Sequence, residues 1–434
     1  MPTEQWNPRC ARTPFVAGAV AVPACGVSCG SDYDLVGGVD VNPGDVTECE
    51  FTPVPGTRVS EYACNPVFPG DDDASVESVG FHVTEVLGHP FYQMWYGSAG
   101  SIEYAVSNNG TDWEASEMSP LFGLDVDTWD EDAFTNQVVV WDPIDARYVM
   151  TYQGFSTGDP ATAEDDTWGI GITTSPDGET WEKHPYNPVI DFTDYSIPTQ
   201  DYWDYFCSQR ASSPDFCALI GVTWSEFTTP RSKMLPCWPL TMTMTERSTF
   251  KGYIGAKSAL DVLESMAWEQ FESDVLTYGS ASVGVDYYPA CHVYSMDALS
   301  VDNWLMNDNH PVLRGEQGTY DAGGVASAAV VELDDVLYMF YLGFEQWTED
   351  PFIEGVISGS VMSLNLATST DGGVTWVKDP ANPIPVNRTE PGEMTAVGAQ
   401  VVGSRIHFWL TDDYEGRSAV GYFYYEPGLE AAHP

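Results

Sequence analysis

A recurring turn motif limits the folds that this chain can adopt. Its fullest copy, residues 369–376 (STDGGVTW), has the form S-x-D-x-G-x-T-W, and weaker copies lie at 175–181 (SPDGETW) and 107–113 (SNNGTDW). In such a hairpin the Asp accepts hydrogen bonds from backbone N–H groups, and the Gly supplies a positive φ. The Trp opens the next strand and can pack in the cleft against a neighbouring sheet. A unit that repeats in this way predicts a propeller or a solenoid.

The segments around these turns have the pattern of short strands. Almost no stretch has the period of an amphipathic helix, and aromatic and β-branched segments are broken by turn residues instead. Four such segments each follow an apolar strand and a short turn: residues 91–96 (FYQMWY), 147–152 (RYVMTY), 337–341 (LYMFY) and 406–410 (IHFWL). The sequence therefore predicts an all-β fold.

A proline motif gives a second measure of the repeat. It is NPV, SPL, NPV, HPV and NPI around Pro66, Pro120, Pro188, Pro311 and Pro383. Each copy would end the outer strand of one blade, where an unpaired edge tolerates proline. Five copies predict a five-bladed β-propeller. The segment after the last copy holds only about three strands, so the strand before Asn65 should complete the final sheet and close the ring.

The interval from Pro188 to Pro311 leaves the number of blades open. It could hold one blade with insertions, because four of the nine cysteines lie in it, or two blades, because residues 266–269 (MAWE) resemble another outer strand. We expect five blades, with six as the alternative. The propeller should span residues 57–427, with a cysteine-containing insertion around 200–295, after an irregular N-terminal arm at 1–56.

The charge balance excludes several classes of partner. The chain has 65 acidic and 16 basic residues, a net charge of −49. Such a field repels nucleic-acid phosphates and anionic membranes, and no run reaches the ~18 apolar residues that a membrane helix needs. We expect no nucleic acid, no membrane span, and a monomer with a solvated acidic surface suited to high salt or an extracellular setting.

The cysteines and the N-terminus bear on location. The nine cysteines lack the spacing of a zinc site, and their scatter is typical of disulfides in an exported protein. Arg9 and Arg12 precede a short apolar run at 15–22, a candidate export segment in which Cys25 could carry a lipid. The run is short and rich in Ala and Gly, so export by this segment stays open. The expected location is extracellular or the cell surface, with a lipoprotein as one form.

The order of these elements resembles a known superfamily. An apolar strand, a Tyr/Trp-rich strand, an S-x-D-G-x-x-W turn and an N-P-V motif are similar to the five-bladed propeller glycosidases, which include arabinanases, xylosidases, invertases, levansucrases and mannoside phosphorylases. The turn resembles the Asp-box of sialidases. The resemblance covers residues 60–425 and implies catalytic carboxylates that project from inner strands into a central funnel. It also implies that Asp177 and Asp371, at the blade periphery, are turn residues.

Glycoside cleavage requires one carboxyl group that protonates the leaving oxygen and a second that acts as base or nucleophile. Acids just before the expected inner strands are the candidates, although 65 acids would place some there by chance. The pairs Trp129-Asp130 and Tyr320-Asp321 occupy equivalent points of two repeats, where an aromatic ring could stack on a sugar beside a carboxylate. The catalytic candidates are Asp73, Asp132, Asp321 and Glu393, and the substrate-binding candidates are Trp129, Asp130 and Tyr320.

Several functions remain open. A glycosidase acting on carbohydrate without an organic cofactor is the main hypothesis, and a non-catalytic glycan-binding or surface interaction propeller is the alternative. A sialidase-like exo-glycosidase would need three arginines around a carboxylate, and the Phe-Arg-Ile-Pro motif of that group is missing, as is the Asn-Asp-Pro-Asn-Gly motif of invertases. The arginines available are Arg58, Arg147, Arg210, Arg314 and Arg388.

Metal binding has weak support in the sequence. The loop with Asp125, Asp127, Asp130 and Asp132 could hold calcium, but it lacks the glycine and the final glutamate of an EF-hand, and a solvated loop is the default. No other metal site is predicted. His82 and His292 could face the funnel, although a lone histidine is more commonly structural.

Overall fold

The structure is a computed structural model. It describes residues 49–68, 76, 78–98, 100–123, 128–156, 167–191, 235–244, 250–257, 292–300, 303–306, 312–315, 319–322, 324–344, 362–386, 394–414 and 417–428. The chain divides into two units, Met1–Glu48 and Cys49–Pro434, and every described residue belongs to the second. The regular secondary structure of these residues is entirely β.

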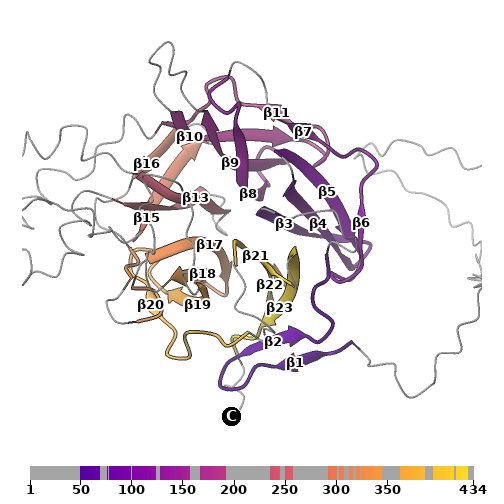
Figure 1. Cartoon of the computed structure of the whole chain (residues 1–434), viewed down its shortest axis with the longest axis vertical. Coiled ribbons are helices and arrows are strands. Elements are labelled where there is room, and N and C mark those ends of the chain that lie inside the picture. The colour runs from indigo at the N-terminus through magenta and orange to yellow at the C-terminus, as the bar shows by residue number, and fades with distance from the viewer. Residues whose placement is uncertain are drawn as a thin grey trace, which may run out of the picture. The chain divides into compact units, whose positions relative to one another are not determined.

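The described strands form five antiparallel sheets, named here blades I to V (Figure 1). Blade I contains β3 (Ser78–Val86), β4 (His89–Ser98), β5 (Ser101–Ser107) and β6 (Trp113–Ala115), and β7 (Phe122–Gly123) pairs with β5. Blade II contains β8 (Ala133–Asp142), β9 (Arg147–Ser156), β10 (Thr167–Ser175) and β11 (Glu182–Lys183), and β12 (Ile190–Asp191) pairs with β10.

The other three blades follow in chain order. Blade III contains β13 (Leu235–Met244), β14 (Phe250–Lys257), β15 (His292–Ser300) and β16 (Asn303–Met306). Blade IV contains β17 (Gly324–Leu333), β18 (Val336–Phe344), β19 (Met362–Ser369) and β20 (Val377–Lys378). Blade V combines β21 (Ala396–Val402), β22 (Arg405–Asp413) and β23 (Ser418–Tyr425) with β2 (Val59–Tyr62) and β1 (Phe51–Pro53) from the start of the unit.

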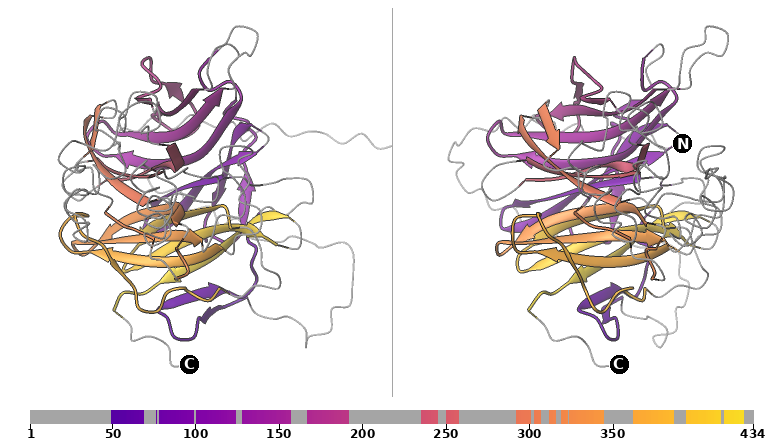
Figure 2. Two further views of the ribbon diagram at one scale, coloured as in Figure 1. Left: turned by 60° about the vertical axis from the view of Figure 1, so that its left-hand side comes forward. Right: turned by 90° about the vertical axis from the view of Figure 1, so that its left-hand side faces the viewer.

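The first strands of the blades close a ring. Each contacts the first strand of the next blade, in the cycle β3, β8, β13, β17, β21 and back to β3. Figure 1 looks down the resulting axis, and Figure 2 shows the same blades from the side. The prediction of a five-bladed all-β propeller is confirmed, and the interval from Pro188 to Pro311 contributes one described sheet. Residues 266–269, the basis of the six-blade alternative, lie outside the described residues.

Stacking of the blades explains why the strand sequences are apolar on both faces. A middle strand lies between two neighbouring sheets, so neither of its faces meets water. In β18 (VLYMFYLGF) every position after the first is buried. One apolar cluster joins blades IV and V through side chains such as Phe340 and Phe408, whose rings stack at 4.6 Å.

Blade V is completed by the N-terminal hairpin, as predicted. Strand β2 pairs with β23, and β1 pairs with β2 at the outer edge. A disulfide between Cys49 and Cys64 joins the two ends of this hairpin. Beyond it, Asn65 accepts a hydrogen bond from Tyr422 N at 2.8 Å and donates one to Tyr422 O at 3.3 Å. The end and the beginning of the unit are therefore held together by strand pairing and side-chain hydrogen bonds, while the disulfide closes the hairpin on itself.

The residue before each described proline of the repeat acts as a substitute strand partner. Asn187 accepts from Ile172 N and donates to Ile172 O, both at 2.9 Å, and Asn382 bonds Leu366 in the same way at 2.9 and 2.8 Å. Ser119 fills this place in blade I, where its hydroxyl accepts from Tyr104 N at 2.8 Å. A carboxamide carries one donor and one acceptor, like a peptide group, which explains the preference for Asn. The peptide bonds to Pro66, Pro120, Pro188 and Pro383 are cis.

The turn motif lies between the third and fourth strands of blades I, II and IV. Asp371 Oδ1 accepts hydrogen bonds from Val374 N and Thr375 N at 3.1 and 2.9 Å, and Gly373 has φ of 88°. These hydrogen bonds hold the pKa of Asp371 well below its usual range, with Thr375 the leading cause. Asp371 and Asp177 are turn residues, as expected.

Each of these turns contacts the preceding blade. Its tryptophan packs edge-on against an aromatic ring of that blade, at centroid distances of 5.5 to 6.4 Å. The pairs are Trp113 with Trp409, Trp181 with Trp95, and Trp376 with Tyr253. Trp95 Nε1 also donates to Gly178 O at 2.8 Å. The expected packing of Trp376 against a neighbouring sheet is confirmed.

The turn of blade I has one side-chain hydrogen bond with the donor and acceptor positions exchanged relative to the turn of blade II. This exchange can be tested by substitution. Asn109 Nδ2 donates to Asp112 Oδ2 at 2.8 Å, whereas in blade II Thr180 Oγ1 donates to Asp177 Oδ2 at 3.2 Å. Asn109→Asp alone brings two exposed carboxylates together and should destabilise the fold by about 0.5–1 kcal/mol in urea unfolding. Adding Asp112→Thr restores the pair of blade II and should recover the loss. A double variant no more stable than Asn109→Asp would contradict this account.

Candidate functional site

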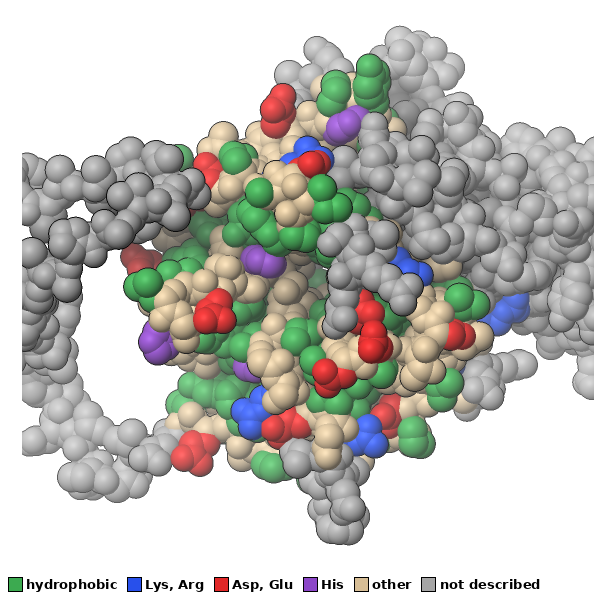
Figure 3. All heavy atoms as spheres, turned by 180° about the vertical axis from the view of Figure 1, so that it is seen from behind, with side chains coloured by type: hydrophobic (Ala, Val, Ile, Leu, Met, Phe, Trp, Pro, Cys, Tyr) green, Lys and Arg blue, Asp and Glu red, His purple; other side chains and the backbone are tan. Residues whose placement is uncertain are grey.

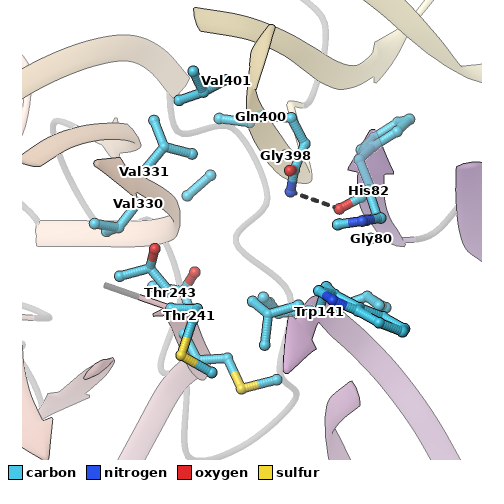
Figure 4. Close-up of a pocket in the computed structure, with 18 of the residues that line it drawn as sticks. Gly80, His82, Trp141, Thr241, Thr243, Val330, Val331, Gly398, Gln400 and Val401 are labelled. Atoms are coloured by element: carbon cyan, nitrogen blue, oxygen red, sulfur yellow. Dashed lines mark hydrogen bonds between the residues drawn. The ribbon is translucent and has the colours of Figure 1, made fainter. Parts of the chain in front are cut away.

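A cavity of ≈ 330 Å³ lies on the axis, lined by the first strands of all five blades. Figure 4 shows side chains from each of these strands around it. Apolar groups such as Val79, Val330 and Val401 form much of the wall. The polar groups come mainly from His82, Thr241, Thr243 and Gln400. The axis is therefore hollow in the described part of the ring.

Contacts between neighbouring blades hold the cavity wall in place. The wall carries little net charge. Gln400 Nε2 of β21 donates to Phe81 O of β3 at 2.7 Å, the hydrogen bond drawn in Figure 4. His82 faces the cavity with its ring edge-on to Tyr148 at 5.4 Å. Burial lowers the pKa of His82 to about 4, so this imidazole is neutral near pH 7. Among the described lining residues, Glu332 is the one carboxylate.

The pair of carboxylates expected in the central funnel is therefore not found among the described residues at this level of the axis. The reason lies in the position of the acids along the strands. In β8, β13 and β17 the cavity is lined by the middle and later residues of the strand, such as 138–141 and 328–332, whereas the candidate acids precede the first strands in the sequence. The described candidates Asp132 and Asp321 lie at the ends of their blades where the first strands begin.

All four catalytic candidates precede a first strand in the sequence. Asp132 directly precedes β8, and Asp321 lies shortly before β17. Asp73 and Glu393 precede β3 and β21 but lie outside the described residues, and their roles stay predictions. Asp132 is exposed, and its backbone N–H donates to Phe155 O at 3.0 Å, which ties the start of β8 to the end of β9.

Asp321 is fully buried and held by three groups of its own blade. Its carboxylate accepts hydrogen bonds from Thr319 Oγ1 at 2.7 Å and from Tyr341 OH at 3.0 Å, and Lys378 Nζ lies 2.7 Å away. Burial raises the pKa of Tyr341, which keeps its phenol protonated as the donor. Lys378 belongs to the outer strand β20, so the ion pair spans the blade from its entry loop to its outer edge.

Asp130 repeats this arrangement in blade II. It is 1% exposed and accepts from Thr128 Oγ1 at 2.7 Å and Tyr152 OH at 2.9 Å, with Lys183 Nζ of β11 at 3.0 Å. A glycine on the second strand makes the approach possible in each blade. A Cβ on Gly343 would lie 2.8 Å from Asp321 Cβ, and one on Gly154 would overlap Trp129.

The two aromatic candidates pack between blades. Trp129 stacks on Tyr152 at 5.8 Å and joins the cluster between blades I and II, while Tyr320 joins the cluster between blades III and IV. Neither ring is among the residues that line the axial cavity. Sugar binding by Trp129, Asp130 and Tyr320, and catalysis by Asp321, stay predictions, and the contacts of these four residues favour a structural role.

Sequence reasoning identified the repeated acids but not the lysines that pair with them. The signal was present. Both blades have Thr-aromatic-Asp at 128–130 and 319–321, Tyr-x-Gly at 152–154 and 341–343, and Trp-x-Lys at 181–183 and 376–378. A lysine at a fixed place after each turn motif indicates a partner for an acid at a fixed place before each first strand.

The structure places two of the candidate arginines and part of the candidate calcium loop. Arg58 lies beside Tyr425 at the outer edge of blade V, whereas Arg147 opens β9 of blade II, so these two do not share a carboxylate site. Asp130 of the calcium candidate loop pairs with Lys183, and Asp125 and Asp127 lie outside the described residues. No group of three or more His, Cys, Asp or Glu that could hold a metal ion is found in the part that the structure describes. The same residues contain no helix long and apolar enough to cross a membrane.

Comparison with known proteins gives a likeness in structure alone. No protein-family model and no curated protein sequence matches the chain. A solved glycoside hydrolase superposes with a TM-score of 0.50 at 12% identity, over 84% of this chain and 92% of that one. A thermostable family-43 glycoside hydrolase has a TM-score of 0.47 at 13% identity, over 83% and 96%. The endo-arabinase from Bacteroides thetaiotaomicron has 0.46 at 10%, over 83% and 97%. The expected resemblance to glycosidase propellers is confirmed at the level of the fold.

Proposed function

We propose that this protein is a carbohydrate-active propeller that hydrolyses glycosidic bonds with carboxylates at one end of its axis. The observation that carries the proposal is the exposed Asp132 just before β8, in a closed ring in which the first strands β3, β17 and β21 are also preceded in sequence by acids. The shared fold with a glycoside hydrolase supports it. A disulfide in the closing hairpin supports an oxidising location outside the cell or on its surface.

The lysine pairing of two candidate acids supports a choice of catalysts among the others. Asp321 and Asp130 are each paired with a lysine inside a blade. We assign the chemistry to Asp132 together with Asp73 and Glu393. One of these carboxyl groups protonates the leaving oxygen, and another acts as base or nucleophile. A separation of about 5–5.5 Å between the two carboxyl groups gives retention and about 6.5–9.5 Å gives inversion.

Release of sugar from a panel of aryl glycosides tests the proposal. Asp132→Asn and Glu393→Gln should each lower kcat/KM by about 100-fold or more, because a positioned acid or base contributes that factor. Asp112→Asn, an exposed acid in a blade I turn, is the matched control and should keep full activity. Asp321→Asn should lower the melting temperature and leave kcat of the folded enzyme intact. Unchanged activity in both site variants would overturn the site assignment.

A glycan-binding propeller is the second candidate. It is favoured by one observation, namely that the described wall of the axial cavity carries a single carboxylate. Under this alternative no aryl glycoside releases sugar, yet the protein is retained on a polysaccharide column. We expect the retained form to be a monomer.

A further inference from the structure

A second cavity lies at the rim of the ring, between blades IV and V, away from the axis. Its volume is ≈ 280 Å³. One wall is the β1–β2 turn with Arg58, and the opposite wall is the chain after β20 with Asp379 and Ala381. Figures 1 and 2 both show the β1–β2 hairpin at the edge of the ring. We call this cavity the rim cleft.

The floor of the rim cleft is apolar and firmly packed. Val59, Leu366 and Ile384 are at most 4% exposed and belong to the core that joins blades IV and V. The floor therefore does not collapse or open with the walls. A rigid apolar floor with a few polar groups above it is the usual composition of a small-molecule site.

Two opposite charges stand over this floor. Arg58 Nη1 donates to Tyr425 OH at 2.9 Å, which fixes the guanidinium and uses one of its five N–H groups. Asp379 Oδ1 accepts from Ala381 N at 2.8 Å, and its second carboxylate oxygen has no hydrogen-bond partner among the described residues. The cleft therefore has the guanidinium N–H donors of Arg58 on one wall and a carboxylate acceptor of fixed orientation, Asp379, on the other.

The charges select the class of ligand. Arg58 and Asp379 cancel, so a neutral ligand leaves the cleft without net charge, whereas the −49 of the whole chain repels an anion. A neutral sugar unit fits these features, because its vicinal hydroxyls donate to a carboxylate, its oxygens accept from a guanidinium, and its C–H face packs on apolar side chains. The volume admits about one such unit rather than a chain.

We propose that the rim cleft binds one neutral sugar unit, free or at the end of a glycan, through Arg58 and Asp379. The cleft lies on the outer strands and contains none of the acids assigned to hydrolysis. It would hold a glycan at the edge of the ring whether or not the axis is catalytic.

Binding is tested with Asp132→Asn protein, in which turnover is expected to be slowed, by calorimetry or saturation-transfer NMR. The probes are neutral hexoses and pentoses, a neutral disaccharide, galacturonate and glucosamine. We expect a neutral sugar to bind with a Kd of roughly millimolar order, as a few polar contacts allow. Arg58→Ala and Asp379→Asn should each weaken it at least about tenfold. Arg147→Ala, an arginine of blade II, is the matched control and should leave the Kd unchanged.

The outcomes separate this proposal from hydrolysis. Melting curves show whether Arg58→Ala remains folded, and Asp379→Asn tests the opposite wall with a smaller change. No binding of any neutral sugar, tighter binding of galacturonate, or a Kd that neither variant alters would each overturn the proposal. Binding at the rim in a wild-type protein that releases no sugar would overturn the proposed hydrolysis and leave the rim cleft standing. The reverse result would overturn the rim cleft alone.

Discussion

Lys378→Met is expected to destabilise the fold by about 3–5 kcal/mol, the usual cost of removing one partner of a buried ion pair. The substitution keeps most of the apolar stem but removes the ammonium group 2.7 Å from Asp321, whose side chain is fully buried. The carboxylate cannot move to water, because Thr319 and Tyr341 hold it inside blade IV. The measurement is the free energy of unfolding in urea.

A second substitution separates charge from packing. In Lys378→Met/Asp321→Asn the buried carboxylate is replaced by a neutral amide, whose oxygen can still accept a hydrogen bond from Tyr341. The double variant should therefore be more stable than Lys378→Met. Lys183→Met in blade II should show the same loss, because Asp130 is held in the same way. A loss below about 1 kcal/mol in both single variants, the value for an exposed pair, would show that these ion pairs do not hold the blades.

Loss of the Cys49–Cys64 disulfide is expected to lower the free energy of unfolding by about 3 kcal/mol, the value for a closed loop of this length. The bond joins residues 15 apart in sequence, at the two ends of the hairpin that completes blade V. Without the disulfide, the unfolded hairpin has more chain entropy, which stabilises the unfolded state relative to the folded state. The protein should therefore unfold at a lower urea concentration. The measurement is the urea midpoint of Cys49→Ser/Cys64→Ser.

The single variants serve as the control. Cys49→Ser and Cys64→Ser each break the same bond, so each should lose as much as the double variant, and their effects should not add. Hydrolytic activity per folded molecule should not change, because the hairpin lies at the rim. Additive losses in the single variants would show that the two cysteines act separately.

The ring was predictable from local signals. The S-x-D-x-G-x-T-W turns indicated repeated hairpins, and the proline motifs indicated the number of blades and the origin of the closing strand. These signals are local because a turn and an edge each impose a backbone geometry that few residue types satisfy. The segment after the last proline motif holds about three strands, which predicts that the strand before Asn65 completes the final sheet, and β2 does pair with β23.

The candidate site was less predictable because a carboxylate before an inner strand can either be buried in an ion pair inside its blade or remain exposed. Asp130 and Asp132 are two residues apart, yet one is buried against Lys183 and the other is exposed. Residue type cannot distinguish these two acids, because burial depends on which of the two side chains points into the blade from the loop before the first strand. The lysine that decides it lies in another strand, about 50 residues later for either pair.

The origin of the closing strand has a consequence for biosynthesis. Strand β2 is synthesised before blades I to IV, and its partner β23 is synthesised after them. Until then the hairpin carries an open edge that other chains can pair with. The ring therefore closes only after β23 has been made, and a nascent chain stalled before β23 would have its first and last blades unsealed.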